Sequence, residues 1–531
     1  MLFTDAVSIL SKSSSYAVST ENDLDSYLVS IKEDLYVEMP IEHRFFDVLE
    51  NLSEHSRKVI FLCGSSGDGK SELLIRAKKR FSESYLKFHL DATHSFAPHH
   101  SAVDTLNNLF KEFENSNYSL VIGINIGMLG NYAEEAESQH IKRILKEYLR
   151  NGRSLENFEF INFEDYPKFR ITREGYEADF VSQLLTKITN PNSYLYKSYI
   201  LQENSENNSS EQVQKLINYK LLCDKDVQKV IIELLFKIRL FNNQFITARN
   251  FLDLIHELIC GKGYLFDNLF NQGDNELLEK IKEFDPTLLR TKNIDRFILS
   301  FELSTTSEKF EEFKEYLKDF LKIDNLNNAM SYIRLFYLLK FSDFGNGYQQ
   351  DFKEDFVEDL LLNYLEFYRH HQYYDPSISK PILKSFYSRD LVFAIRNYIN
   401  KKAPYLEEDQ YLISEYGHNQ IISILKITPN FAAIEKYSSQ QPCVKFKTFL
   451  KVKDHENISI PVDISLFDLI LKLKSGYRPS KNDRSVVVIL NKIVNQLLVL
   501  ANKSNQITVK TSEQFFRLTL EDDEIEVAGI K

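Results

Sequence analysis

A stretch near residue 64 combines the residue types that bind phosphate groups. Gly64, Gly69, Lys70 and Ser71 fit the pattern G-x-x-x-x-G-K-S/T. The positions between the two glycines are occupied by Ser65, Ser66, Gly67 and Asp68. In such loops the glycines allow positive φ angles, the backbone N–H groups turn toward a phosphate, the lysine reaches the β- and γ-phosphates, and the hydroxyl ligates Mg²⁺. Residues 64–71 are therefore predicted to bind ATP and Mg²⁺.

The elements on either side of this loop match what its chemistry needs. Val59 to Cys63 is a short apolar run that predicts a buried strand, and Lys70 opens a predicted helix. A strand before the loop and a helix after it are the context that the pattern requires. The N-terminus of the helix would add its partial positive charge to the anion site. We call residues 64–69 the glycine loop.

Further apolar runs predict that this strand belongs to a larger sheet. Residues 85–91, 119–125 and 158–163 have the pattern of strands, and residues 102–113 and 134–150 have the pattern of helices between them. This alternation predicts a parallel sheet that is covered by helices on both faces. Ligands bind such sheets at the carboxyl ends of the strands, where the glycine loop is expected.

Polar residues at the ends of these strands are the candidates for catalysis. Asp91 ends the second predicted strand and is the expected ligand of Mg²⁺, while Asn125 ends the third and is expected to sense the γ-phosphate. An alternative assigns the metal-binding acid to Glu164 or Asp165, which follow the fourth strand. No run of four apolar residues followed by Asp-Glu occurs in this part of the sequence. The sequence therefore indicates ATP binding more clearly than ATP hydrolysis.

A helical stretch follows the predicted sheet from about residue 178 to residue 261. Within it, Thr247 is a predicted N-cap, Arg249 lies on the first turn of the same helix, and Gly261 ends that helix. A helical subdomain behind a nucleotide-binding core forms a lid, and an arginine at the start of a lid helix can reach the γ-phosphate. The predicted catalytic residues are Lys70, Asp91, Asn125 and Arg249.

The sequence as a whole predicts an α/β protein. Its expected parts are an AAA+-like P-loop NTPase sheet, a helical lid, a mostly helical region and a small α/β C-terminal domain. A helix that begins at Pro40 has an apolar face and is expected to pack beside the sheet. The expected ranges are a helical leader at 1–57, the NTPase core at 58–177, the lid at 178–265, the helical domain at 266–450 and the C-terminal domain at 451–531.

The composition narrows the classes of function. The formal net charge of −11 argues against a broad basic face that binds nucleic acid unaided. Local basic clusters at 380–402 and in the turn at 476–484 are the candidate contacts for DNA or for a partner protein. The four cysteines lack the paired spacing of a zinc site. No uninterrupted apolar run approaches the ~20 residues of a membrane helix, and the N-terminus lacks the pattern of a signal peptide, so we expect a cytoplasmic protein without a membrane partner.

Six segments together resemble the DptF family, the P-loop ATPases of bacterial DNA phosphorothioation-dependent restriction systems. The resemblance spans most of the chain and depends on the combination of segments and their order, because the glycine loop alone is common to many NTPases. It implies that Gly64 to Ser71 form the ATP site and that the chain acts with two partner proteins, DptG and DptH. The six segments are SKSSSYAVS (11–19), VIFLCGSSGDGKSELL (59–74), LDATHSFAP (90–98), VIGINIGMLGNY (121–132), FITARNFLDLI (245–255) and SGYRPSKNDR (475–484).

The resemblance also implies a biological role. In such systems host DNA carries sulfur in its backbone, and DNA that lacks this modification is attacked. The implied function is that of an ATP-driven subunit of a restriction complex that acts on unmodified DNA. The alternative, favoured by the acidic charge, is a nucleotide-switched signalling or assembly NTPase that recruits a protein partner without contacting DNA. A nuclease is a poorer interpretation, because no convincing set of clustered acids with a nearby lysine occurs outside the predicted NTPase core.

Overall fold

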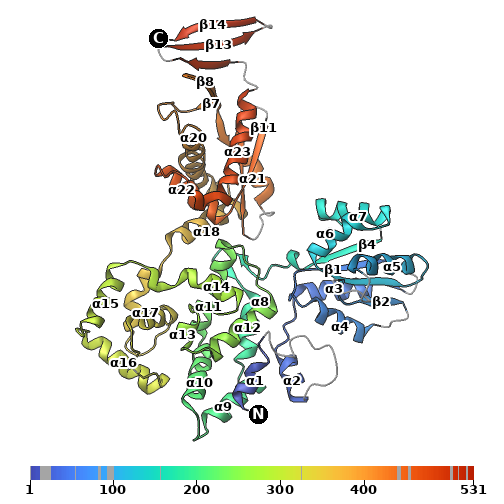
Figure 1. The fold of residues 1–531 in the computed structure, drawn as a ribbon, viewed down its shortest axis with the longest axis vertical. Coiled ribbons are helices and arrows are strands. Elements are labelled where there is room, and N and C mark those ends of the chain that lie inside the picture. Colours follow the sequence, from blue (N-terminus) through green and yellow to red (C-terminus); the bar gives the residue numbers. More distant parts are fainter. Residues whose placement is uncertain are drawn as a thin grey trace. The chain divides into compact units, whose positions relative to one another are not determined.

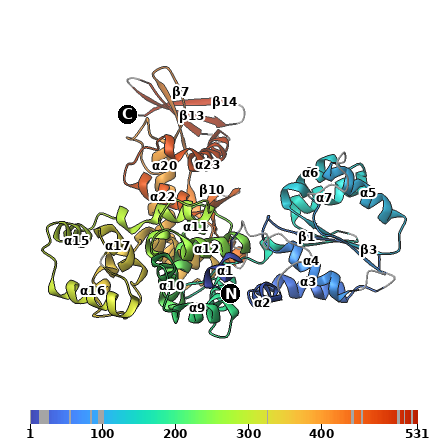
Figure 2. The same ribbon diagram turned by 60° about the horizontal axis from the view of Figure 1, so that its bottom comes forward.

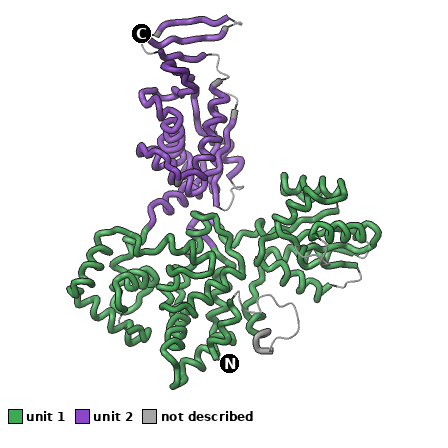
Figure 3. The backbone as a smooth tube through the Cα atoms, in the orientation of Figure 1, with its two compact units in different colours: residues 1–170, 178–357 green, residues 171–177, 358–531 purple. Residues whose placement is uncertain are grey.

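The described part of the chain forms two compact units (Figure 3). One unit contains residues 1–170 and 178–357, and the other contains residues 171–177 and 358–531. Residues 12–19 and 93–98, which belong to two of the segments that resemble the DptF family, lie outside the described residues. The computed structural model describes residues 2–11, 26–53, 56–81, 85–92, 101–155, 157–324, 326–438, 444–452, 456–502, 506–511, 514–521 and 524–530.

The first unit contains a parallel sheet, as the sequence predicts. Among the described residues the sheet has four strands in the order β2-β3-β1-β4, all parallel (Figure 1). The strands are β1 Val59–Cys63, β2 Leu86–His89, β3 Ser119–Ile124 and β4 Phe158–Asn162. Cys63 at the end of β1 is paired with Ile124 on one side and with Asn162 on the other. β1 and β3 are buried along their whole length, which explains their continuous apolar sequences.

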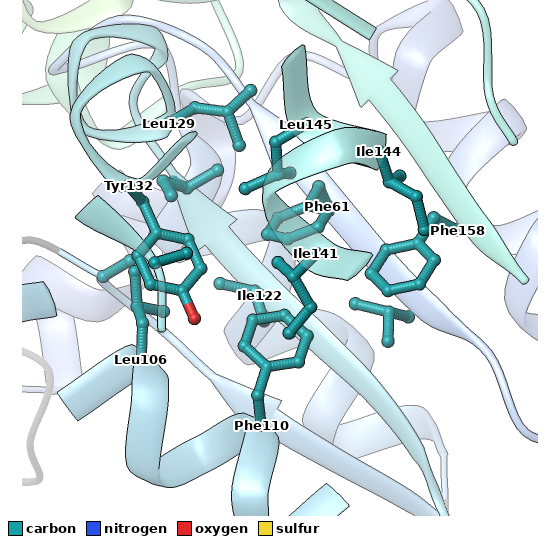
Figure 4. Close-up of a cluster of buried hydrophobic side chains, with 14 of the residues drawn as sticks. Phe61, Leu106, Phe110, Ile122, Leu129, Tyr132, Ile141, Ile144, Leu145 and Phe158 are labelled. Carbon is teal, nitrogen blue, oxygen red and sulfur yellow. The ribbon is translucent and has the colours of Figure 1, made fainter. Parts of the chain in front are cut away.

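Helices on one face of this sheet enclose an apolar layer (Figure 4). Phe61 of β1 packs there with Phe110, Tyr132 and Ile144, which come from three different helices. Because β1 exposes alternate side chains to opposite faces, Phe61 and its neighbours two residues away all belong to this layer. The three helices are α5 Ala102–Glu114, α6 Ile126–Glu135 and α7 Gln139–Asn151.

The connection between α6 and α7 corrects one prediction. The sequence predicts a single helix at 134–150, but the chain forms two helices with a break at Ala136, whose ψ of 137° is not helical. Asn107 of α5 stabilises this break, because its side-chain oxygen accepts the N–H of Glu137 at 3.2 Å and the hydroxyl of Tyr132 at 3.1 Å. A tertiary contact therefore ends a helix that local sequence would continue.

The opposite face of the sheet is covered by α3 Pro40–Glu50 and α4 Lys70–Arg80 (Figure 2). Ile41, Phe45 and Leu49 of α3 are buried against this face together with Ile60 and Leu62 of β1. The predicted packing of the Pro40 helix beside the sheet is confirmed. With helices on both faces, the fold of this part is α/β. Two more helices precede α3, namely α1 Phe3–Ser8 and α2 Ser26–Asp34.

The rest of the first unit is helical, as the sequence predicts for residues 178–261. The hydroxyl of Thr247 accepts the N–H of Asn250 at 3.2 Å, so Thr247 is the N-cap of its helix, and Gly261 follows the last helical residue. The helices are α8 Asp179–Ile188, α9 Tyr194–Glu203, α10 Ser210–Cys223, α11 Lys225–Phe241, α12 Ala248–Cys260, α13 Leu265–Asn268, α14 Glu276–Ile281, α15 Lys292–Glu302, α16 Glu308–Leu321 and α17 Ala329–Leu338. Short 3-10 helices are η2 Phe163–Asp165, η3 Lys282–Phe284, η4 Pro286–Leu288 and η5 Tyr348–Phe356.

The second unit combines helices with antiparallel sheets. Among the described residues one sheet has five strands in the order β14-β13-β12-β8-β7, and another has three in the order β11-β10-β9. Its helices are α18 Asp359–Gln372, α19 Ser379–Ser385, the π-helical η6 Phe386–Val392, α20 Phe393–Ile399, α21 Phe431–Tyr437, α22 Ile464–Lys474, the 3-10 helix η8 Lys481–Asp483 and α23 Arg484–Asn502. Its strands are β7 Gln410–Tyr416, β8 Asn419–Ile424, β9 Ile427–Pro429, β10 Phe446–Val452, β11 Glu456–Val462, β12 Gln506–Lys510, β13 Phe515–Glu521 and β14 Glu524–Ile530. The short strands β5 Arg170–Ile171 and β6 Tyr176–Glu177 form a separate pair.

This unit corrects the predicted domain boundary at 450/451. That boundary falls inside β10, and strands already begin at residue 410, within the range 266–450 for which a helical domain is predicted. The physical reason is pairing between distant residues: Ile507 of β12 pairs with Ser423 of β8 in one continuous sheet. The observed division at 357/358 therefore replaces the predicted one.

One helix bears on the prediction about membranes. Within the described residues, α23 contains a window, Arg484–Ala501, that is long and apolar enough to cross a membrane by length and composition. Only 22% of this window is buried inside the structure. Length and composition are weak evidence for a membrane helix, because the core helices of many proteins meet the same criterion.

Candidate functional site

The glycine loop lies at the centre of the carboxyl edge of the parallel sheet. It leaves β1, which is flanked by β3 and β4, and it leads directly into α4 at Lys70. The N–H of Gly64 donates to the carbonyl of Ile124 at 3.3 Å, so the first residue of the loop continues the pairing between β1 and β3. The predicted strand, loop and helix are confirmed.

The three glycines of the loop are needed for different reasons. Gly67 and Gly69 have φ angles of +83° and +103°, which side chains rarely allow. Gly64 does not have a positive φ, contrary to the expectation for this loop. A Cβ at Gly64 would instead lie 3.0 Å from the ring of Phe163 and 3.2 Å from the carboxylate of Asp68, so this position requires glycine for space.

Lys70 points back along the loop from the first turn of α4. Its ammonium group donates to the carbonyl of Gly64 at 3.0 Å and to the carbonyl of Ser65 at 2.6 Å. Burial lowers the pKa of Lys70, and the nearby carboxylates of Asp68 and Asp91 oppose this shift. The lysine therefore places a cation at the loop itself, as the sequence predicts.

Asp68 and Lys168 form an ion pair at the same loop. One carboxylate oxygen of Asp68 lies 2.7 Å from the ammonium of Lys168, and the other accepts the N–H of Ser65 at 2.7 Å. Both charged side chains are only 11% exposed. Sequence reasoning did not identify Lys168, which lies 100 positions from Asp68. The available signal was Asp68 itself, because a carboxylate inside an anion-binding loop requires a neutralising cation.

The N-terminus of α12 packs against the glycine loop. A Cβ at Gly67 would lie 3.1 Å from the hydroxyl oxygen of Thr247 and 3.3 Å from the Cβ of Arg249. Thr247 caps α12, so the first turn of this helix is the part that approaches the loop. The N-termini of two helices, α4 and α12, therefore meet at residues 64–69, and each adds partial positive charge there. The structure places the Cβ of Arg249 next to the loop, and the predicted role of this residue at a γ-phosphate stays a prediction.

Asp91 lies two strands away from the loop, on the same edge of the sheet. It follows β2, and the N–H of the next residue, Ala92, donates to the carbonyl of Gly123 in β3 at 2.9 Å. At an interstrand spacing of about 4.8 Å, the ends of β2 and β1 are about 10 Å apart. The carboxylate is half-buried, and its charge acts on Lys70 in the direction that raises the pKa of the lysine. Asp91 is therefore within electrostatic range of the loop.

Asn125 ends β3 between these two strand ends, and it serves as a helix cap. Its side-chain oxygen accepts the N–H of Met128 at 2.6 Å and so caps α6. The side-chain oxygen of Asn125 is therefore engaged by the first turn of α6. The predicted interaction with a γ-phosphate would have to use the amide donor of Asn125, and that role stays a prediction.

The alternative acids lie on the other side of β1. Glu164 and Asp165 belong to the 3-10 turn after β4, and both are exposed. Partial burial of its carboxyl group raises the pKa of Asp165. Burial also raises the pKa of Cys63 and of Tyr148, and the charge of Asp165 adds to both shifts. Asp165 is therefore within electrostatic range of Cys63 at the end of β1 and of Tyr148 in α7.

The remaining residues of the motif are placed for contact with a ligand. Ser66 and Ser71 are exposed, and Ser71 lies on the first turn of α4. Among the described residues there is no cluster of three or more His, Cys, Asp or Glu that could hold a metal ion by itself. A magnesium ion bound with a nucleotide does not need such a cluster, because phosphate oxygens and waters complete its six ligands. Ser71 and Asp91 carry a hydroxyl and a carboxylate of the kind this ion prefers, and their role as its ligands stays a prediction.

Comparison with known proteins adds no assignment to this geometry. No protein-family model matches the chain, and no curated protein sequence matches it. The chemistry of the site therefore rests on its own residues, which combine backbone amides, two helix N-termini and the ammonium groups of Lys70 and Lys168 around one loop. This arrangement is suited to binding an anion that carries several negative charges.

Proposed function

We propose that this protein binds ATP with Mg²⁺ at the glycine loop and hydrolyses it. The observation that carries the proposal is the approach of two helix N-termini to one loop: α4 begins at Lys70, and the first turn of α12 lies against Gly67 with Arg249. A single glycine turn before a helix is common. A second helix whose first turn brings an arginine next to the same turn adds a cation that can stabilise a γ-phosphate.

Each proposed role follows from the position of the residue. Lys70 exchanges the loop carbonyls for oxygens of the β- and γ-phosphates, and Arg249 approaches the γ-phosphate from the start of α12. Ser71 and Asp91 would hold Mg²⁺, which offsets phosphate charge during hydrolysis. Asn125 would orient the reacting end of the nucleotide through its amide donor. The carboxylate of Asp91 is favoured over those of Glu164 and Asp165 because Asp91 is half-buried at the strand ends and its charge acts on Lys70, whereas the other two residues are exposed.

The biological setting that we propose is a DNA phosphorothioation-dependent restriction complex in the cytoplasm. This part of the proposal rests on the six segments that resemble the DptF family. The protein would act with the partners DptG and DptH on DNA that lacks the phosphorothioate. ATP would shift the helical region between two arrangements, which requires contacts that differ between ATP and ADP. Arg249 is the residue at which such a difference is expected.

A second candidate function is a nucleotide-switched signalling or assembly NTPase that recruits a protein partner without contacting DNA. The charge distribution favours this candidate. In the basic stretch at 380–402, the ammonium of Lys402 lies 2.6 Å from Glu415. The cation of Lys474 lies 2.6 Å from Asp390. Exposed basic side chains remain in both stretches, for example Lys384 in the first and Arg478 in the turn at 476–484, so each stays a candidate contact for DNA or a partner protein.

The proposal is tested by nucleotide binding and turnover. We expect the purified protein to bind Mg·ATP in isothermal titration calorimetry. We expect its ATPase rate to rise with unmodified DNA and both partners, and not with phosphorothioated DNA of the same sequence. Lack of affinity for Mg·ATP, alone and with the partners, would refute the nucleotide site. ATP-dependent partner binding with no response to either DNA would favour the switch function.

A further inference from the structure

The ion pair between Asp68 and Lys168 attaches the glycine loop to the segment that follows β4. Two contacts of this segment reach the loop: the ring of Phe163 lies against Gly64, and the ammonium of Lys168 lies 2.7 Å from Asp68. Phe163 and Lys168 are five positions apart, so the segment between them borders one side of the loop. The ammonium of Lys168 also lies 5.3 Å from the centre of the Phe180 ring in α8.

Asp68 has two opposite effects on an anion site. Its carboxylate accepts the N–H of Ser65 at 2.7 Å, which fixes the path of the loop. The same carboxylate carries a negative charge inside a loop that would bind phosphates, where like charges repel. Because the Asp68 side chain is only 11% exposed, water screens this charge weakly. A cation beside Asp68 is therefore needed if the loop is to remain attractive to a triphosphate.

We propose that Lys168 is a positioning residue of the nucleotide site, which neutralises Asp68 and thereby sets the affinity of the glycine loop for ATP. This inference rests on the proposed function of the loop. Lys168 acts through Asp68, and it is not a ligand of the phosphates. The geometry favours this role because both charged groups are buried together and because the Phe180 ring of α8 contacts the same ammonium.

A set of charge variants separates this role from direct phosphate binding. We expect Lys168→Met to raise the dissociation constant for Mg·ATP at least about tenfold, because it leaves the buried Asp68 carboxylate without its neutralising cation beside the phosphates. The double variant Asp68→Asn with Lys168→Met removes both charges. Its amide oxygen can still accept the N–H of Ser65, so we expect affinity within about threefold of the wild type. Asp68→Asn alone should bind Mg·ATP at least as tightly as the wild type.

The matched control is Arg170→Met. Arg170 lies two positions from Lys168, and its own ion pair with Asp179 is exposed, at 57% and 62% for the two side chains. Salt screens exposed pairs, so we expect the dissociation constant of this control to stay within about twofold of the wild type. The measurement is isothermal titration calorimetry with Mg·ATP on the full chain, with circular dichroism to verify that each variant is folded.

The outcomes distinguish the inference from the function on which it rests. Wild-type affinity in Lys168→Met would overturn the proposal. Equal weakness in Lys168→Met and in the double variant would also overturn it, because Lys168 would then contact the phosphates directly or act on the fold alone. Absence of Mg·ATP binding by the wild-type protein would refute the nucleotide site, and this role of Lys168 with it.

Discussion

The substitution Lys70→Ala tests whether the glycine loop binds the phosphates of ATP. The ammonium of Lys70 makes two hydrogen bonds to loop carbonyls, at 3.0 and 2.6 Å. Hydrogen bonds that involve a charged group are worth about 1.5–3 kcal/mol each, and we take about 1.5 kcal/mol for a carbonyl acceptor and about 3 kcal/mol for a charged phosphate oxygen. Exchange of two carbonyls for two phosphate oxygens therefore gains about 3 kcal/mol. Loss of this gain corresponds to an affinity for ATP that is weaker by about 150-fold.

The same substitution should leave the fold intact. The substitution removes two hydrogen bonds to carbonyls, but it also removes a half-buried charge. Burial of that charge is unfavourable, as the lowered pKa of Lys70 indicates. The two effects oppose each other, so we expect the free energy of unfolding to change by less than about 1 kcal/mol. Circular dichroism during thermal unfolding would measure this change.

A lysine elsewhere on α4 supplies the control for this experiment. Lys79 is exposed in the last turn of the helix, nine positions after Lys70. Lys79→Ala removes the same charge without touching the loop, so its affinity for Mg·ATP should equal that of the wild type. If calorimetry finds that Lys70→Ala binds Mg·ATP within threefold of the wild type, the lysine does not contact the phosphates and the reasoning is refuted.

Four further predictions follow from the geometry. Asp91→Asn should retain ATP binding and lose hydrolysis at least hundredfold, and a normal rate in a phosphate-release assay would transfer the metal role to an acid after β4. Arg249→Ala should lower turnover at least about tenfold in the same assay, and unchanged turnover would exclude a role at the γ-phosphate. Gly67→Ala should destabilise the first unit more than Gly69→Ala. Both substitutions cost about 1–2 kcal/mol at positive φ, but only a Cβ at Gly67 meets α12, and equal denaturant midpoints would contradict this contact. Burial lowers the pKa of His371 from 6.5 to about 4, so the second unit should keep its full stability above pH 6.5 and lose about 3 kcal/mol as the pH falls to 4. A His371→Gln variant with the same pH dependence in denaturant titrations would refute that assignment.

Local sequence is sufficient to predict those elements whose structure depends on residues that are neighbours in the chain. The run from Val59 to Lys70 predicted the strand, the loop and the helix, because an apolar run, glycines and a helix start occur in consecutive positions. The cap at Thr247 and the stop at Gly261 were predicted for the same reason. The chain also carries the signal for a parallel sheet, since its buried strands alternate with amphipathic helices.

Other boundaries depended on distant contacts and could not be predicted. At the break between α6 and α7, the N–H of Glu137 donates to the side chain of Asn107, which belongs to α5. The strands β7 and β8 join one sheet with the C-terminal strands because β8 pairs with β12. In both cases local sequence allowed a helical interpretation, and partners far along the chain decided the outcome.

The sequence determines some residues of the candidate site, and the tertiary structure determines the others. The sequence alone marks Lys70 and the glycines, whose chemistry depends on spacing within eight positions. Only the tertiary structure brings Lys168 to Asp68 and the start of α12 to Gly67, across about 100 and 180 positions of chain. The order of the strands likewise decides that Asp91 lies two strands from the loop. The physical reason is that charge interactions depend on distance in space, and packing of the sheet and its helices sets those distances.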